Sequence, residues 1–353
     1  IHYNICYNVI IIYCILNTYS QLLFKNKEHS MKKTVFTAVV GLALSTSAFA
    51  AAPDADALRK QVSGFFKPLA EQMPGTENDT AEKIALGEKL YFETALSVNG
   101  TQSCNTCHRL DEKLGGVDNK RFSDGAIEGA IGDRNSPTVW NAGFHIAQFW
   151  DGRAADLKEQ AKGPILNPVE MAIPDEATAV KNIKDAGYSD EFAKVFGKKD
   201  AVTYDNIAEA IAAFERTLIS KDRFDDFLKG DNNALTAEEL TGLNDFVSSG
   251  CIACHTGPLL GGNMYQKMGL VKPYPNTEDT GRFQETNNPA DKFMFKVPSL
   301  RIISQTAPYF HDGAAETLED AIYQMGVYQL GRELDDDKVA SIATFLKSLD
   351  NQR

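Results

Sequence analysis

The sequence predicts an all-α fold that is built from two similar helical domains. Apolar residues recur at helical spacing through most of the chain. Strand signals are sparse, and loops rich in glycine and proline join the expected helices. Two related segments in the two halves indicate that the second half repeats the first.

The expected helices are placed by their periodicity and by their capping residues. Asp79 is a candidate cap for a helix that leads to a first Cys-x-x-Cys-His motif, and a second helix begins near Asp205. Thr236 and Glu239 form a capping box for a third helix, which ends near Gly250 and leads to a second such motif. A final helix is expected over residues 335–349.

The N-terminal residues have the pattern of an export signal. Met31 opens a short basic region, residues 34–44 are small and apolar, and Ala48-Phe49-Ala50 is a small-x-small cleavage site. We therefore expect a signal peptide over residues 31–50, with an apolar stretch too short for a permanent membrane span. Residues 1–30 are rich in amino acids with AT-rich codons, and we interpret them as non-native upstream translation. A real hydrophobic anchor in this segment is the alternative.

The charge of the remaining chain is acidic. Residues 1–50 hold four of the 36 basic residues and one of the 48 acidic ones, which leaves a net charge of −15 on residues 51–353. Such a surface argues against nucleic acid or an anionic membrane as a partner. It suits a soluble protein that meets a neutral or positively charged partner, although an acidic surface also serves solubility alone.

The most specific motif occurs twice. It is Cys104-Asn-Thr-Cys107-His108 in the first half and Cys251-Ile-Ala-Cys254-His255 in the second. This pattern is typical of covalent attachment of a c-type haem, in which the cysteines form thioethers and the histidine binds iron. Zinc binding and a redox disulfide are the alternatives, but neither needs a histidine after each second cysteine. We expect two covalent haem c groups.

A longer repeat extends beyond the two motifs. The segment Phe149–Leu157 resembles Phe310–Leu318, and Pro137 and Pro298 stand at equal distances before them. Duplication of one haem-binding unit explains the match. We therefore expect a first cytochrome c-like domain over residues 51–220 and a second over 221–353, with the final helix as a candidate to pack on the first.

The two copies differ where a sixth iron ligand would come from. Met325 lies in the helix after the second Phe-x-Asp-Gly turn, and its counterpart in the first copy is Pro164, which has no donor atom. A methionine ligand favours electron transfer, whereas an open position admits a small ligand. Glu170, near this gap, is a candidate general acid–base for hydrogen peroxide. The open alternatives are Met264 or Met268 as the second ligand, Met171 as a ligand of the first iron, and a purely structural Glu170.

These motifs together resemble the bacterial di-haem cytochrome c peroxidases. The similar segments are Arg134–Thr138, Gln148–Arg153, Gly163–Met171 and Ala307–Gly313, and the resemblance covers essentially all of residues 51–353. It implies two helical cytochrome c domains in a periplasmic homodimer. It also implies reduction of hydrogen peroxide to water with electrons from a small cytochrome c or a cupredoxin.

The resemblance assigns roles to individual residues. It makes the first haem peroxidatic, with Glu170 as the catalytic acid–base, Gln160 beside it and Trp150 between the haems. It makes the second haem the electron acceptor, with His255 and Met325 on its iron and His311 nearby. A calcium ion is implied at the domain junction, where oxygen donors suit it, on Asn135, Thr306 and Pro308.

One departure from that family bears on the first haem. Many members have a histidine in the loop after the first motif that blocks the iron until the second haem is reduced, and residues 109–133 contain none. We therefore expect an open first iron, with Lys113, Lys120 and His145 as other residues able to reach it. The competing functions are a di-haem electron carrier and a related di-haem oxidase that acts on a partner protein and has tyrosine in place of methionine.

Overall fold

The computed structural model describes residues 52–110, 115–197 and 199–350. The chain divides into a unit of residues 1–50 and a unit of residues 51–353. The expected upstream segment and signal peptide lie outside the described residues. None of the helices in the described part is both long and apolar enough to cross a membrane.

The described part is mostly helical, as expected, with one small sheet. Helices of the first half are α2 (Ala55–Val62), α3 (Ala81–Phe92), α4 (Cys104–Cys107), α5 (Leu157–Leu166), α6 (Glu176–Asp185), α7 (Ser189–Phe196) and α8 (Tyr204–Glu215). Those of the second half are α9 (Arg223–Lys229), α10 (Ala237–Ser249), α11 (Phe283–Thr286), α12 (Leu318–Leu330) and α13 (Asp336–Lys347). Strands β1 (Tyr265–Lys267) and β2 (Met294–Lys296) pair antiparallel, with Gln266 opposite Phe295. Single 3-10 turns are η1 (Thr76–Asn78), η2 (Thr94–Leu96), η3 (Ala142–Phe144), η4 (Cys251–Ala253), η5 (Pro289–Asp291) and η6 (Ile303–Gln305).

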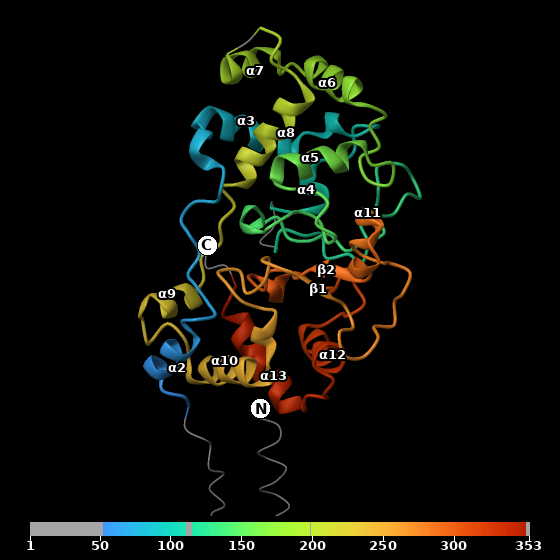
Figure 1. Cartoon of the computed structure of the whole chain (residues 1–353). Coiled ribbons are helices and arrows are strands. Elements are labelled where there is room, and N and C mark those ends of the chain that lie inside the picture. Colours follow the sequence, from blue (N-terminus) through green and yellow to red (C-terminus); the bar gives the residue numbers. More distant parts are fainter. Residues whose placement is uncertain (1–51, 111–114, 198, 351–353) are drawn as a thin grey trace, which may run out of the picture. The chain divides into compact units, whose positions relative to one another are not determined.

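Each half contains a pair of tightly packed helices. Helix α3 packs on α8, and α10 packs on α13 (Figure 1). A glycine permits close contact in both pairs: a Cβ on Gly87 would lie 1.8 Å from the backbone oxygen of Ala210, and one on Gly242 would lie 2.1 Å from that of Ser341. A glycine at the closest contact of both helix pairs supports a common origin for the two halves.

This contact predicts a local stability defect. The substitution Gly242→Ala is expected to lower the free energy of unfolding by about 1–3 kcal/mol, because the new methyl group overlaps a backbone oxygen that cannot rotate away. Gly64→Ala is the control, since no atom lies within 4 Å of a Cβ there. Denaturant unfolding of both holoprotein variants checks the prediction, and equal midpoints would contradict it.

Helix caps agree with the sequence except at one site. The capping box of Thr236 and Glu239 opens α10, which ends at Gly250 with a φ of 95°. The expectation for Asp79 is wrong: Thr80 caps α3, and Asp79 binds the guanidinium of Arg216. A short acidic side chain before a helix is compatible with either role, and the distant arginine decides between them.

The repeated turns adopt the same backbone conformation in both halves. Phe149 and Phe310 have φ values of 65° and 73°, in the left-handed region that is uncommon for side chains of this size. Antiparallel bridges close both turns, Gln148 with Ala154 and Tyr309 with Ala315. The following helices, α5 and α12, then begin at equivalent residues. The sequence repeat is therefore also a structural repeat.

The hydrophobic cores differ in one respect from the expected domains. One core lies within the first half, around α3, α5 and α8. The other is built from the second half, but Leu58, Val62 and Phe66 from the start of the described chain join it. Helix α13 packs on α10 and α12 rather than on the first half. An apolar stripe shows that a helix is buried but not which partner it packs on, so the sequence could not assign α2 to the second-half core. The domain boundary near residue 220 stays a prediction.

Candidate functional site

The first Cys-x-x-Cys-His motif forms a single helical turn, α4. The hydroxyl of Thr106 accepts a hydrogen bond from the backbone N–H of Ser103 (3.0 Å) and fixes the start of the turn. The Nδ1 atom of His108 lies 2.9 Å from the carbonyl oxygen of Pro137. With Nδ1–H donating to that carbonyl, Nε2 is left with a lone pair, which is the tautomer of a metal-binding histidine.

The second motif has the same arrangement. It follows the end of α10 and forms the 3-10 turn η4. The Nδ1 atom of His255 lies 2.9 Å from the carbonyl oxygen of Leu260. Burial lowers the pKa of both motif histidines, so both rings are neutral and able to bind a metal through Nε2.

The four cysteines of the motifs are partly buried, and none of them forms a disulfide in the described part of the chain. Burial raises the pKa of Cys107 to about 11 and that of Cys251 to about 11, and it raises the pKa of Cys104 further. Each pair of thiols is followed by a histidine whose Nδ1 atom faces a backbone carbonyl, which leaves Nε2 free for iron. This arrangement fits thioether attachment of haem.

A large cavity adjoins the second motif and is lined mainly by apolar side chains. Cys251, Cys254 and His255 lie at its wall together with Met268 and Met325. Met325 projects from α12, a helix whose start Thr317 caps by accepting from the N–H of Asp320 (3.1 Å). An apolar cavity with the haem motif on its wall and a methionine from a rigid helix fits a six-coordinate haem. Both Met268 and Met325 remain candidates by position.

Glu170 lies close to the first motif. It follows α5 in a tight turn, where its Oε1 atom accepts a hydrogen bond from Nδ2 of Asn167 (2.6 Å). Its charge acts on the thiol of Cys107, which places the carboxyl group near the first haem motif. Burial raises the pKa of Glu170 above its ordinary value, against the opposing charge of Arg153. A partly buried carboxyl group with a raised pKa beside a cofactor site suits proton transfer.

Of the other proposed catalytic residues, Trp150 has the more defined setting. Its Nε1–H donates to the carbonyl oxygen of Asn135 (2.9 Å), and its ring meets that of His311 edge-on, with centroids 6.4 Å apart. Both rings line the cavity of the second motif. His311 also stacks on Phe295 at 4.1 Å. Gln160 lies on α5, the helix that ends at Leu166, directly before Asn167 begins the Glu170 turn.

The three residues proposed for calcium line that cavity too. Asn135 is buried, and its side-chain amide donates to the carbonyl oxygens of Lys120 (2.9 Å) and Arg121 (3.3 Å). Thr306 and Pro308 approach from the second half of the chain. Segments that are 171 residues apart in the sequence thus line one cavity; the calcium ion itself stays a prediction.

Three of the four residues considered as other ligands of the first iron have defined surroundings in the described part of the chain. Met171 is buried in the core of the first half. His145 lies at the cavity of the second motif, where its Nδ1 atom is 2.6 Å from Nζ of Lys296. Lys120 pairs with Asp124 at 2.6 Å on the surface. Lys113 lies outside the described residues.

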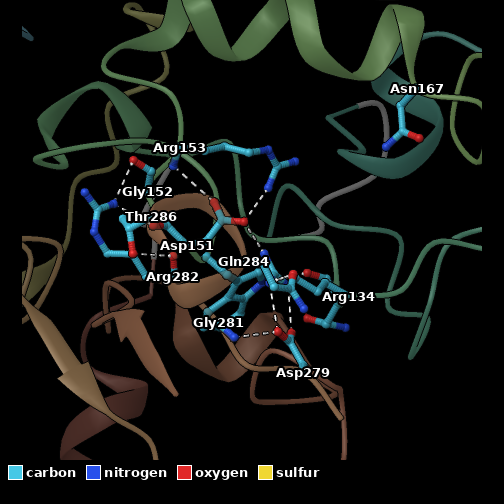
Figure 2. Close-up of polar contacts among 12 residues, drawn as sticks. Arg134, Asp151, Gly152, Arg153, Asn167, Asp279, Gly281, Arg282, Gln284 and Thr286 are labelled. Atoms are coloured by element: carbon cyan, nitrogen blue, oxygen red, sulfur yellow. Dashed lines mark hydrogen bonds and ion pairs between the residues drawn. The ribbon is translucent and has the colours of Figure 1, made fainter. Parts of the chain in front are cut away.

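A partly buried ion-pair network gives no signal in the sequence. Arg134 binds Asp279 through two hydrogen bonds of 2.7 and 2.8 Å and also binds Asp151 (Figure 2). Asp151 accepts a further bond from Arg153 (2.8 Å), and Arg282 donates to the carbonyl oxygen of Asp151 (2.8 Å). The network joins the first repeated turn to the second half. No local motif marks it, because its members are far apart in the sequence.

Glu215 and Lys296 were also missed. Glu215 ends α8 beside Cys104, and burial raises its pKa to about 8. Its Oε2 atom has no hydrogen-bond partner among the described residues. Lys296 is buried in β2 at the cavity of the second motif. Their residue types give no signal in the sequence, since an isolated charge is usually solvated.

Known proteins resemble this chain over most of its length. It is 50% identical to cytochrome c551 peroxidase of Nitrosomonas europaea over 273 residues, 77% of this chain and 80% of the relative. It is 45% identical to cytochrome c551 peroxidase of Pseudomonas aeruginosa over 85% of this chain and 88% of the relative. The chain belongs to the di-haem cytochrome c peroxidase family. A model of that family, described as di-haem cytochrome c peroxidase, matches residues 81–233.

The solved structures agree with this membership. A MauG-like protein associated with microbial copper homeostasis matches with a TM-score of 0.71 and 27% identity over 81% of this chain and 94% of that one. Membership of the family makes this chain a peroxidase and implies two haem c groups. The two motifs, each with two partly buried cysteines and a histidine held by a backbone carbonyl, fit that cofactor content.

Proposed function

We propose that this peroxidase reduces hydrogen peroxide at a haem on Cys104, Cys107 and His108. The electrons arrive through a second haem on Cys251, Cys254 and His255. The observation that carries the proposal is Glu170, a partly buried carboxyl group with a raised pKa beside the first motif, in the half that has Pro164 in place of Met325.

Residues of the first half would transfer the protons of the reaction. Bound haem supplies the iron that receives peroxide and the electrons that break its O–O bond. Ionised Glu170 takes the proton from the near oxygen and, now neutral, returns it to the far oxygen, which leaves as water. Asn167 orients the carboxyl group by its bond to Oε1, and Gln160 is proposed to lie beside it. Two protons and two electrons per peroxide give two waters.

The residues of the second half would deliver the electrons. His255 and Met325 would be the protein ligands of the second iron, and a histidine–methionine pair suits electron transfer. Trp150, at the cavity wall and in contact with His311, is proposed to lie between the two haems. The calcium ion proposed on Asn135, Thr306 and Pro308 would hold the two halves together there.

The surroundings of the enzyme are part of the proposal. We infer a periplasmic homodimer that takes electrons from a small cytochrome c or a cupredoxin, with residues 51–220 as the peroxidatic domain and 221–353 as the electron-transfer domain. The acidic charge of the chain supports a donor with a positive docking face. Turnover of peroxide with reduced cytochrome c or reduced cupredoxin tests the activity; a pure electron carrier would give none, and an oxidase would instead modify a partner protein.

The first iron gives a separate prediction. With His108 as its protein ligand, and with Met171 and His145 engaged elsewhere, the oxidised enzyme is expected to show one high-spin haem and to turn over without prior reduction. An EPR spectrum of the ferric protein and a progress curve without pre-reduction check this. Two low-spin signals, together with a lag that pre-reduction abolishes, would contradict it.

A further inference from the structure

Lys296 is a buried lysine with no carboxylate partner among the residues that the structure describes. It is 7% exposed, and its ammonium group contacts Nδ1 of His145 at 2.6 Å. Within the described ranges, no carboxylate lies within ion-pair distance of its Nζ atom. Buried ammonium groups are costly unless an anion compensates them, so the arrangement calls for an anion that the described residues do not supply.

The acidic group whose charge acts on Lys296, Asp151, already forms ion pairs with two arginines. Asp151 acts on Lys296 through its charge, but both arginines of the network bind its carboxylate, Arg134 through one Nη atom and Arg153 at 2.8 Å (Figure 2). Asp279 is held by Arg134 in turn. The cationic side chains around Asp151 therefore outnumber the carboxylates.

The position of Lys296 indicates where the missing anion would be. Lys296 and His145 line the same cavity as Cys251, Cys254 and His255, and the rest of that lining is mainly apolar. The backbone N–H of Lys296 donates to the carbonyl oxygen of Trp150 (2.8 Å), and its strand pairs with β1, so the side chain starts from a fixed backbone. A ligand for this cavity needs an apolar body and an anionic edge.

We propose that Lys296, supported by His145, is the counter-ion for a propionate carboxylate of the second haem. A haem has an apolar macrocycle and two carboxylates on one edge, and the motif cysteines would fix it at this cavity. Burial lowers the pKa of Lys296 to about 8, and a nearby carboxylate would raise that pKa again by favouring the charged form. His145 accepts from the ammonium group and limits its rotation. The inference rests on the proposal that the second motif carries haem.

The charge on Lys296 should then set the potential of the second haem. The substitution Lys296→Met keeps the length of the side chain and removes the charge. It is expected to shift the ferric–ferrous equilibrium at least tenfold towards ferric, which is about 59 mV for one electron. Lys296→Arg should retain the wild-type potential to within that margin. The control is Lys267→Met, which makes the same change at an exposed residue of the paired strand and should leave the potential unchanged.

Two measurements separate this proposal from the one on which it rests. Haem content per chain is determined first. Fewer than two haems in the wild type would contradict the proposed function, because the second haem would then be missing.

Spectroelectrochemical titration at pH 7 then gives the potentials of the haems. The resonance Raman propionate bending band reports the contact with the carboxylate. We expect a lowered potential and a shifted band in Lys296→Met. An unchanged potential, or a lowered potential with an unmoved band, overturns the contact. If Lys296→Met does not accumulate, Lys296→Gln serves the same test.

Discussion

Glu170→Gln is expected to reduce peroxide turnover by at least about 100-fold while both haems stay attached. Glutamine has nearly the shape of glutamate and can still bond to Asn167, but it cannot take the proton from peroxide. The loss should therefore appear in kcat rather than in folding or haem content. Steady-state assays with a reduced donor, together with absorption spectra of the loaded enzyme, make the measurement.

The exposed residue Glu128 gives the matched control, because Glu128→Gln makes the same change in the neighbouring loop. Its turnover should equal that of the wild type. Burial raises the pKa of Glu170, so the ionised base is lost as the pH falls through a value above that of an ordinary glutamate. The acid limb of the pH–rate profile should lie at that raised value and vanish in Glu170→Gln. Full turnover in the haem-loaded variant would rule out the role.

Met325→His is expected to lower the potential of the second haem by more than about 59 mV, a tenfold change in its one-electron equilibrium. A thioether ligand raises the potential of a haem relative to a second imidazole. The iron stays six-coordinate and low-spin, but electron transfer from the donor becomes unfavourable and turnover slows. Potentiometric titration and turnover with a reduced cytochrome measure both consequences.

The other cavity methionine provides the comparison. Met268→Leu keeps an apolar side chain at the cavity wall and should leave the potential and the spectrum of the second haem unchanged. If Met268→Leu instead abolishes the low-spin signal while Met325→His leaves the potential as it was, Met268 is the ligand. Met325 would then serve only to pack α12 against the cavity.

Much of the site could be predicted from the sequence because its motifs consist of residues that are close together in the chain. The Cys-x-x-Cys-His motifs need only neighbouring residues, and the repeat of Phe149 and Phe310 reflects a turn whose conformation is set within a few residues. Asp79 shows the limit of local reasoning. Beside a helix start it has the pattern of a cap, yet Arg216, distant in sequence, binds it instead.

The sequence by itself determined the mainly helical class, the two haem motifs, the repeat and the difference between Met325 and Pro164. Each of these depends on residue type and spacing along the chain. Only the tertiary structure decided that α2 joins the core of the second half and that Arg134 pairs with Asp279. It also decided that Lys296 lines a cavity with no carboxylate of the described residues in ion-pair contact. These features depend on burial and on contacts between distant segments. Burial converts an ordinary surface charge into one that requires a partner.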